Sequence, residues 1–302
     1  MKIIKRIVIG IAVFYACCVV YALIPQKSVS VQELAGKNSR FINVSGRMLH
    51  YEKYGAGRPI ILVHGFAGST YTWRYVIPLL AESNTVYALD LPGFGLSDKS
   101  PEASYDLRSQ ARALIDFAHA LNLPSVSLAG HSMGGVIVGI AAAEAPQKVD
   151  RLIIIDAGFY HGGPPKLFQH LFFPFNVVMA RSFYTKGARS KSLLSSYYNK
   201  SLITDDLVDH YLKPASTPHA ADALAKMMST ASTESYDGIS PRITTPTMLI
   251  WARNDNHAPV ADGERLQREI KGSQLVILEE SGHMVQEEKP VEVAAAIKKF
   301  LQ

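Results

Sequence analysis

The residues best placed to do chemistry in this chain surround Ser132, in the segment Gly130-His131-Ser132-Met133-Gly134. An alternating apolar run at 126–129 predicts a strand before the serine, and small residues from Val136 to Ala145 predict a helix after it. Glycine two places before and two places after the serine permits a tight strand-to-helix turn, which exposes the hydroxyl beside the N–H groups of a helix N-terminus. Such a serine becomes a nucleophile once a base takes its proton. Without a base and an acid, the segment is only a glycine-rich turn.

A candidate base and a candidate acid follow two later strands. His283 follows a predicted strand at Gln274–Leu278, and Asp255 follows one at Thr247–Trp251. Parallel strands bring their carboxyl ends to one edge of a sheet, so we expect both side chains beside Ser132. A histidine that reaches the serine and is oriented by a carboxylate is the arrangement that activates a serine. Asp156, which ends the strand after the nucleophile helix, is the alternative acid, or else it caps its loop.

The elements that must position these residues alternate between strands and helices. A hairpin is predicted from Arg40–Val44 and Arg47–Tyr54, strands at Pro59–Val63, Thr85–Leu89 and Arg151–Ile155, and helices at Tyr105–Leu121, near Gly263–Ile270 and from Pro290. This alternation predicts an α/β fold with a mostly parallel sheet covered by helices on both faces. The residues that follow strand ends should share one rim: His64, Asp90, Ser132 and Asp156.

The alternation stops at residues of about 160 to 238, where prolines, aromatic clusters and short helical stretches take over. We interpret this segment as an inserted helical lid over the rim. It contains an unusually apolar block at 167–179. The block is either ordinary lid core or part of the cleft lining, and a cleft lining would favour a hydrophobic acyl group, since apolar pockets gain about 0.8 kcal/mol per buried CH₂.

The N-terminus predicts contact with a membrane. Residues 7–24 are apolar and uncharged and follow Lys2, Lys5 and Arg6. We interpret residues 1–24 as a transmembrane anchor whose N-terminus stays in the cytoplasm, or as a cleaved signal peptide. Lipid attachment at Cys17 and a buried core helix are further alternatives. Residues 25–39 are predicted to be a linker and residues 40–302 the catalytic domain, which all exported alternatives place outside the cytoplasm, anchored at a bacterial inner membrane or secreted.

Composition excludes several other classes. The net charge of +5 over 302 residues is modest and forms no basic run beyond the N-terminus, so no nucleic-acid partner is expected. Both cysteines, Cys17 and Cys18, lie in the N-terminal segment, so the domain has neither a disulfide nor a thiol nucleophile. The histidines lack metal-ligand spacing, so neither a metal nor a cofactor is expected. His131 is expected to pack or to form a hydrogen bond beneath the turn, and His64 to shape the loop that it begins.

Residues of about 40 to 302 resemble an α/β-hydrolase of the lipase/esterase type. The matching segments are His64-Gly65-Phe66, residues 90–97, Gly130 through Gly135, residues 255–259 and Ser281-Gly282-His283. The chain is similar to bacterial lipases and carboxylesterases and to membrane-anchored monoacylglycerol lipases. This resemblance implies hydrolysis of a carboxylic ester, a small molecule or a lipid, with water as the second substrate.

The resemblance also implies a role for each residue. Ser132 would attack the acyl carbon, His283 would take and return the proton, and Asp255 would orient His283. The backbone N–H groups of Phe66 and Met133 would form the oxyanion hole. An Asp-x-x-x-Pro segment after the penultimate strand fits the family pattern, which favours Asp255 over Asp156.

Other chemistries of the same fold remain as alternatives. Haloalkane dehalogenases and epoxide hydrolases use a carboxylate nucleophile at this turn, which Ser132 argues against. Carbon–carbon bond hydrolases keep the serine but usually carry a different glycine-rich loop, and perhydrolases share the triad. A member of the fold that binds a ligand without chemistry is the alternative from another class.

Overall fold

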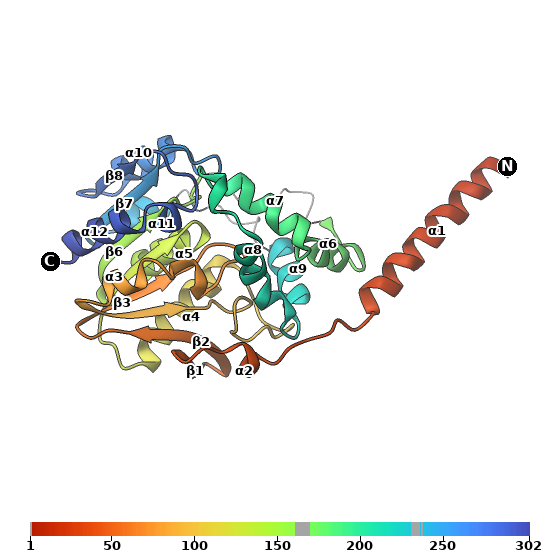
Figure 1. Cartoon of the computed structure of the whole chain (residues 1–302), viewed down its shortest axis with the longest axis horizontal. Coiled ribbons are helices and arrows are strands. Elements are labelled where there is room, and N and C mark those ends of the chain that lie inside the picture. Colours follow the sequence, from red (N-terminus) through yellow and green to blue (C-terminus); the bar gives the residue numbers. More distant parts are fainter. Residues whose placement is uncertain (1, 161–169, 231–235, 237) are drawn as a thin grey trace.

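An eight-stranded sheet forms the centre of the computed structural model, which describes residues 2–160, 170–230, 236 and 238–302 (Figure 1). The strand order is β1-β2-β4-β3-β5-β6-β7-β8. β1 and β2 pair antiparallel, and β3 to β8 run parallel to one another. The strands are β1 Ser39–Val44, β2 Arg47–Tyr54, β3 Arg58–Val63, β4 Asn84–Leu89, β5 Val126–His131, β6 Val149–Ile155, β7 Thr247–Ala252 and β8 Gln274–Leu278. The predicted α/β fold with its mostly parallel sheet is therefore confirmed.

Helices cover both faces of the sheet. One face packs against α4 (Leu107–Ala120), α5 (Met133–Glu144) and α10 (Val260–Glu269). The other packs against α3 (Ile77–Leu80) and α12 (Pro290–Leu301), and α11 (Val285–Glu288) precedes α12. Because the central strands are buried on both sides, they are continuous apolar runs: Ile60 through Val63 of β3 are all fully buried.

The segment between β6 and β7 forms a separate group of helices beside the carboxyl ends of the strands. It consists of α6 (Phe175–Phe183), α7 (Lys186–Ser196), α8 (Asp205–Leu212) and α9 (Ala220–Thr230). Residues 161–169, 231–235 and 237 of the predicted lid, including Leu167 and Phe168 of its apolar block, lie outside the described residues. The rest of the block is not a uniform core, since Val177 is buried whereas Phe172, Phe173 and Met179 are exposed.

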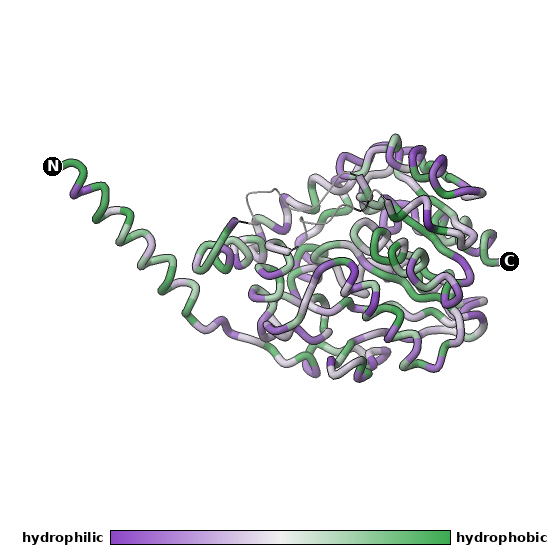
Figure 2. Tube along the Cα trace, turned by 180° about the vertical axis from the view of Figure 1, so that it is seen from behind, coloured by the Kyte–Doolittle hydropathy of each residue, from purple (hydrophilic) through white to green (hydrophobic). Residues whose placement is uncertain are grey.

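The N-terminal segment forms the helix α1 (Lys2–Leu23), which extends away from the sheet domain with its first residues farthest from it (Figures 1 and 2). Within the described part of the chain, Ile3–Leu23 is the one helix that is long and apolar enough to cross a membrane. The predicted linker contains a short helix that sequence reasoning missed, α2 (Val31–Leu34), whose first turn is capped by the side chain of Ser30. The linker also contacts the lid, because the N–H of Val29 donates to the carbonyl of Ser216 at 2.8 Å.

Candidate active site

Ser132 lies between β5 and α5 in a strained backbone conformation. Its φ of 54° and ψ of −120° are unusual for a residue with a side chain. The two flanking glycines are required because a Cβ at Gly130 would lie 2.2 Å from the Gly134 carbonyl oxygen, and one at Gly134 would lie 2.4 Å from that of Val63. α5 begins at Met133, three residues before the predicted start, so the helix N-terminus adjoins the serine directly.

The structure brings Ser132, His283 and Asp255 together in one hydrogen-bonded row. Nε2 of His283 lies 2.9 Å from the Ser132 Oγ, and its Nδ1 lies 2.7 Å from Oδ2 of Asp255. With the proton of a neutral ring on Nδ1 and donated to Asp255, Nε2 is free to accept the serine hydroxyl. His283 comes from the loop after β8 and Asp255 from the loop after β7, the two positions expected from the sequence.

The carboxylate of Asp255 is held in its charged form. Burial raises its pKa, but the hydrogen bond from His283 and two backbone N–H donors outweigh burial and leave the pKa below its ordinary value. Those donors are His257 and Ala258, whose nitrogens lie 2.6 and 3.0 Å from Oδ1. Oδ1 therefore accepts hydrogen bonds from the loop, while Oδ2 accepts the hydrogen bond from His283.

Asp156 lies near Asp255, but the surroundings of its carboxyl group are different. Its Oδ1 accepts the N–H of Ala252 at 2.8 Å, and its Oδ2 has no partner among the described residues. Burial, together with the negative charge of Asp255, raises the pKa of Asp156 well above its ordinary value. No hydrogen bond joins it to His283, so the geometry favours Asp255 as the group that orients the ring.

His131 contacts the candidate base directly. Its Nε2–H donates to the backbone carbonyl of His283 at 2.7 Å, and the two rings lie 4.8 Å apart. Burial and the neighbouring His283 lower the pKa of His131 to about 3, so it is neutral at ordinary pH. The expected packing role beneath the turn thus takes the form of a hydrogen bond that fixes the backbone of His283.

The loop after β3 passes next to the serine. A Cβ at Gly65 would lie 3.0 Å from the Cβ of Ser132, so any side chain at this position would press against the serine. No hydrogen bond between described residues uses the backbone N–H of Phe66 or of Met133. Both donors are therefore available to an anion beside Ser132. His64 shapes this loop as expected, since its Nδ1–H donates to the Gly65 carbonyl at 2.7 Å.

Asp90 supports the rim from below rather than taking part in the serine cluster. It is fully buried and accepts from Nδ1 of His50 and from the N–H of Thr70, both at 2.7 Å, and from the N–H of Leu96 at 2.8 Å. Burial raises the pKa of Asp90, but His50 outweighs it and lowers the pKa to about 2. Sequence reasoning missed His50, which lies in β2 with no motif around it.

The lid is tied to the sheet domain by a second buried carboxylate that sequence reasoning also missed. Glu287 of α11 forms an ion pair with Arg74 at 2.5 Å and accepts the hydroxyl of Tyr197 at 2.7 Å and that of Tyr211. Tyr197 follows α7 and Tyr211 belongs to α8, so one carboxylate holds two lid helices beside the loop of His283.

Comparison with known proteins agrees with this architecture. The family described as alpha/beta hydrolase fold matches residues 58–290. Over 266 residues the chain is 30% identical to a hydrolase of Bacillus subtilis (strain 168), YugF, covering 87% of this chain and 97% of that protein. It is 28% identical to the 2-hydroxy-6-oxo-2,4-heptadienoate hydrolase of Pseudomonas putida, covering 83% and 91%. The solved structure of a membrane phospholipase A, described as a bacterial virulence factor, is 25% identical with a TM-score of 0.73, covering 99% and 96%.

Proposed function

This chain belongs to the α/β-hydrolase family, and we propose that it is a serine hydrolase that cleaves carboxylic esters with hydrophobic acyl groups. The observation that carries the proposal is the hydrogen-bonded row from Ser132 through His283 to Asp255, with distances of 2.9 and 2.7 Å. A serine, a base and an oriented carboxylate at these distances suit acyl transfer.

The reaction would proceed in two halves. The Ser132 Oγ attacks the ester carbonyl while Nε2 of His283 takes its proton, and the N–H groups of Phe66 and Met133 stabilise the oxyanion. The intermediate collapses, and the alkoxide leaves with the proton from His283, which leaves an acyl-enzyme. Water, deprotonated by the same ring, then attacks the acyl carbon and releases the acid with Ser132 restored.

Two observations support a lipid-like ester. The match to the membrane phospholipase A structure extends over 99% of this chain and so includes α1, whereas the match to the heptadienoate hydrolase covers 83%. The lid beside the site also carries exposed aromatic side chains at Phe172 and Phe173. Carbon–carbon bond hydrolysis is the second candidate, favoured by the 28% identity to the heptadienoate hydrolase.

We further propose the arrangement of the whole chain. Residues 1–24 serve as an uncleaved anchor, residues 25–39 as a linker and residues 40–302 as a catalytic domain outside the cytoplasm, with a lid at about 160–238. The Lys2, Lys5 and Arg6 flank supports this orientation, since basic residues stay on the cytoplasmic side of a membrane helix.

A fluorophosphonate probe followed by a substrate panel tests the function. The wild-type chain should be labelled and Ser132→Ala should not. Turnover of soluble esters should rise from acetyl to medium-chain acyl groups. Labelling without ester turnover, but with cleavage of a vinylogous diketone acid, would replace the ester proposal by carbon–carbon hydrolysis. Absence of labelling in wild type would refute the serine mechanism.

A further inference from the structure

The lid helix α6 lies against the proposed membrane anchor. The Phe175 ring stacks on Phe14 with centroids 6.3 Å apart, and the Tyr15 ring meets Phe175 edge-on at 5.9 Å. Farther along, the Arg181 guanidinium donates to the carbonyls of Tyr21 and Ala22, the latter at 3.0 Å. Aromatic packing at one end and a cation on the last carbonyls of α1 at the other fix the two helices side by side.

This contact determines how deep α6 would lie in a bilayer. Phe14 precedes the end of α1 at Leu23 by nine residues, which is about 13 Å along a helix axis. The hydrocarbon core of a bilayer is about 30 Å thick. If α1 spans this core, the N-terminal end of α6 therefore lies beside its apolar middle and not in the headgroup region.

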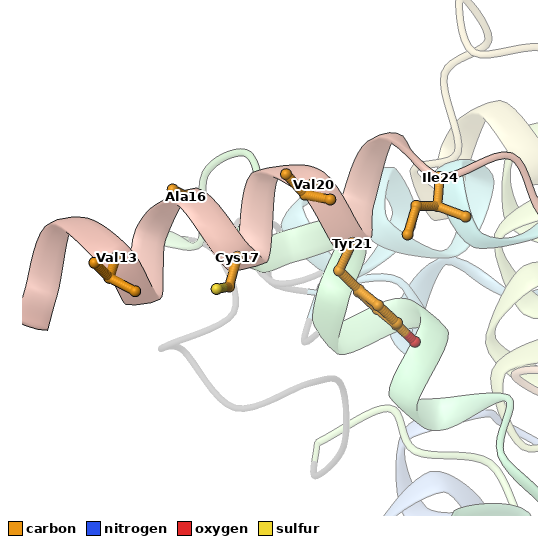
Figure 3. Close-up of a pocket in the computed structure, with 6 residues that line it drawn as sticks. All are labelled: Val13, Ala16, Cys17, Val20, Tyr21 and Ile24. Carbon is orange, nitrogen blue, oxygen red and sulfur yellow. The ribbon is translucent and has the colours of Figure 1, made fainter.

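The side chains at that end of α6 suit hydrocarbon. Phe172 is 64% exposed, Phe173 44% and Met179 41%. Figure 1 shows α6 on the side of the domain that faces α1. A cluster of large exposed apolar side chains continuous with an apolar helix marks a membrane or protein contact and not a surface that faces water. An apolar hollow runs along α1 between successive turns, lined by Val13, Ala16, Cys17, Val20, Tyr21 and Ile24 (Figure 3).

The other end of α6 reaches the proposed oxyanion loop. The Phe183 ring meets the ring of Phe66 at 5.9 Å. Arg189 stacks over Phe183 at 4.8 Å and donates to the carbonyl of Ala67 at 3.3 Å. From Phe175 to Phe183 the helix rises by about 12 Å. One helix thus contacts the anchor at its start and the loop beside Ser132 at its end.

We propose that α6 and the residues just before it, 171–174, insert into the acyl layer of the bilayer beside α1 and lead acyl chains from the membrane to Ser132. The occupant of this surface is the hydrocarbon of a phospholipid bilayer, because the exposed side chains continue the apolar surface of α1, which would lie in the same bilayer. Insertion rests on the proposed membrane anchor and is independent of the reaction, whereas the delivery of an ester substrate also rests on the proposed ester hydrolysis.

Quenching by brominated lipid tests the insertion. Trp73 and Trp251, the native tryptophans, are both fully buried and provide the background. The full chain carrying Phe172→Trp is reconstituted into phosphatidylcholine vesicles with brominated acyl chains. Val291→Trp is the matched control, since Val291 is also 64% exposed but lies on α12, far from α1 (Figure 1). We expect emission from position 172 to be quenched at least two-fold more than from position 291. Equal quenching would overturn the proposal.

A kinetic comparison tests the delivery of substrate. The ratio of the rate on an ester embedded in vesicles to the rate on a soluble short-chain ester should fall at least about ten-fold in Phe172→Glu, because a carboxylate is strongly disfavoured in hydrocarbon. The ratio should stay the same in Val291→Glu. An unchanged ratio in Phe172→Glu would refute delivery through α6. If wild type cleaves neither ester, the proposed function is refuted, while the quenching experiment still decides the insertion.

Discussion

Replacing Asp255 with asparagine removes the negative charge and turns one acceptor oxygen into an NH₂ donor, and the surrounding loop decides which way the new amide turns. The Oδ1 of Asp255 accepts two backbone N–H groups, from His257 at 2.6 Å and Ala258 at 3.0 Å. An asparagine must keep its carbonyl oxygen at this position, because an NH₂ group there would face two donors. Its NH₂ group therefore points to Nδ1 of His283, where Oδ2 now lies at 2.7 Å.

The forced orientation reverses the tautomer of His283. Nδ1 must accept the amide hydrogen, so the ring proton moves to Nε2, which then cannot accept the hydroxyl of Ser132. The variant also loses the negative charge that stabilises the imidazolium in the transition state. Together these losses lower kcat by about 10⁴ where the same change has been made in a serine triad. We expect a loss of about 10³ to 10⁴ in kcat for Asp255→Asn, with KM changed less than three-fold.

The assay is steady-state hydrolysis of a soluble medium-chain ester, run beside the rate of fluorophosphonate labelling and a urea denaturation curve. The denaturation curve separates a loss of chemistry from a loss of folding. Asp156→Asn is the control, because Asp156 makes no hydrogen bond to His283 and its asparagine mimics the protonated acid. Near-normal turnover in Asp255→Asn, with the loss appearing in Asp156→Asn instead, would show that Asp156 orients the base.

Three further predictions concern the groups around this row. Burial and the charge of Asp255 hold the pKa of Asp156 above its value in the unfolded chain, so the folded state binds this proton more tightly. The free energy of unfolding therefore falls as the pH rises above about 4, where the unfolded chain loses the proton and the folded chain keeps it. Asp156→Asn should therefore gain on wild type by up to about 1.4 kcal/mol per pH unit in urea denaturation as the pH rises from about 4 toward the raised pKa, and parallel stabilities would contradict this. In Gly134→Ala the new Cβ would meet a backbone carbonyl at 2.4 Å, so fluorophosphonate labelling should fall at least about 100-fold, whereas Gly187→Ala, with open space around it, should label normally. His131→Phe removes the hydrogen bond to the backbone of the base and should lower kcat about ten- to 100-fold equally from pH 6 to 9, because this histidine is neutral throughout; a loss confined to KM would refute the positioning role.

The residues of the serine row could be predicted because each follows the end of a strand that is recognisable in the sequence. Ser132 and Asp255 come after the buried strands β5 and β7, and His283 comes after β8, a partly buried strand at the edge of the sheet. Parallel strands deliver such residues to one edge whatever the details of packing. The strand bounds themselves were predicted to within two residues, because periodicity and turn residues act locally.

The supporting contacts could not be predicted, because they join residues with no local signal. His131 meets His283 across 152 positions, and Tyr197 meets Glu287 across 90. The resemblance already favoured Asp255 over Asp156, but its physical reason is visible only in the structure, where Asp255 receives the ring of His283 and Asp156 stays buried with its Oδ2 unpaired among the described residues. Both aspartates follow strand ends, so strand order alone leaves them equivalent.

In the lid, the hydrophobic pattern of the sequence does not predict which side chains are buried. A run such as Phe172 to Met179 has the composition of a protein core, and on sequence grounds it was either lid core or cleft lining. The structure divides the run, since Val177 is buried while Phe172 and Phe173 are exposed, and Phe172 packs on Phe175, which in turn contacts α1. A side chain that faces outward is costly in water but favourable in hydrocarbon, so the proposed lipid environment at this end of the molecule would stabilise these residues where they lie. The proposal of a membrane-facing lid therefore rests on the contact between Phe175 and Phe14, which ties the exposed aromatic residues to the proposed anchor.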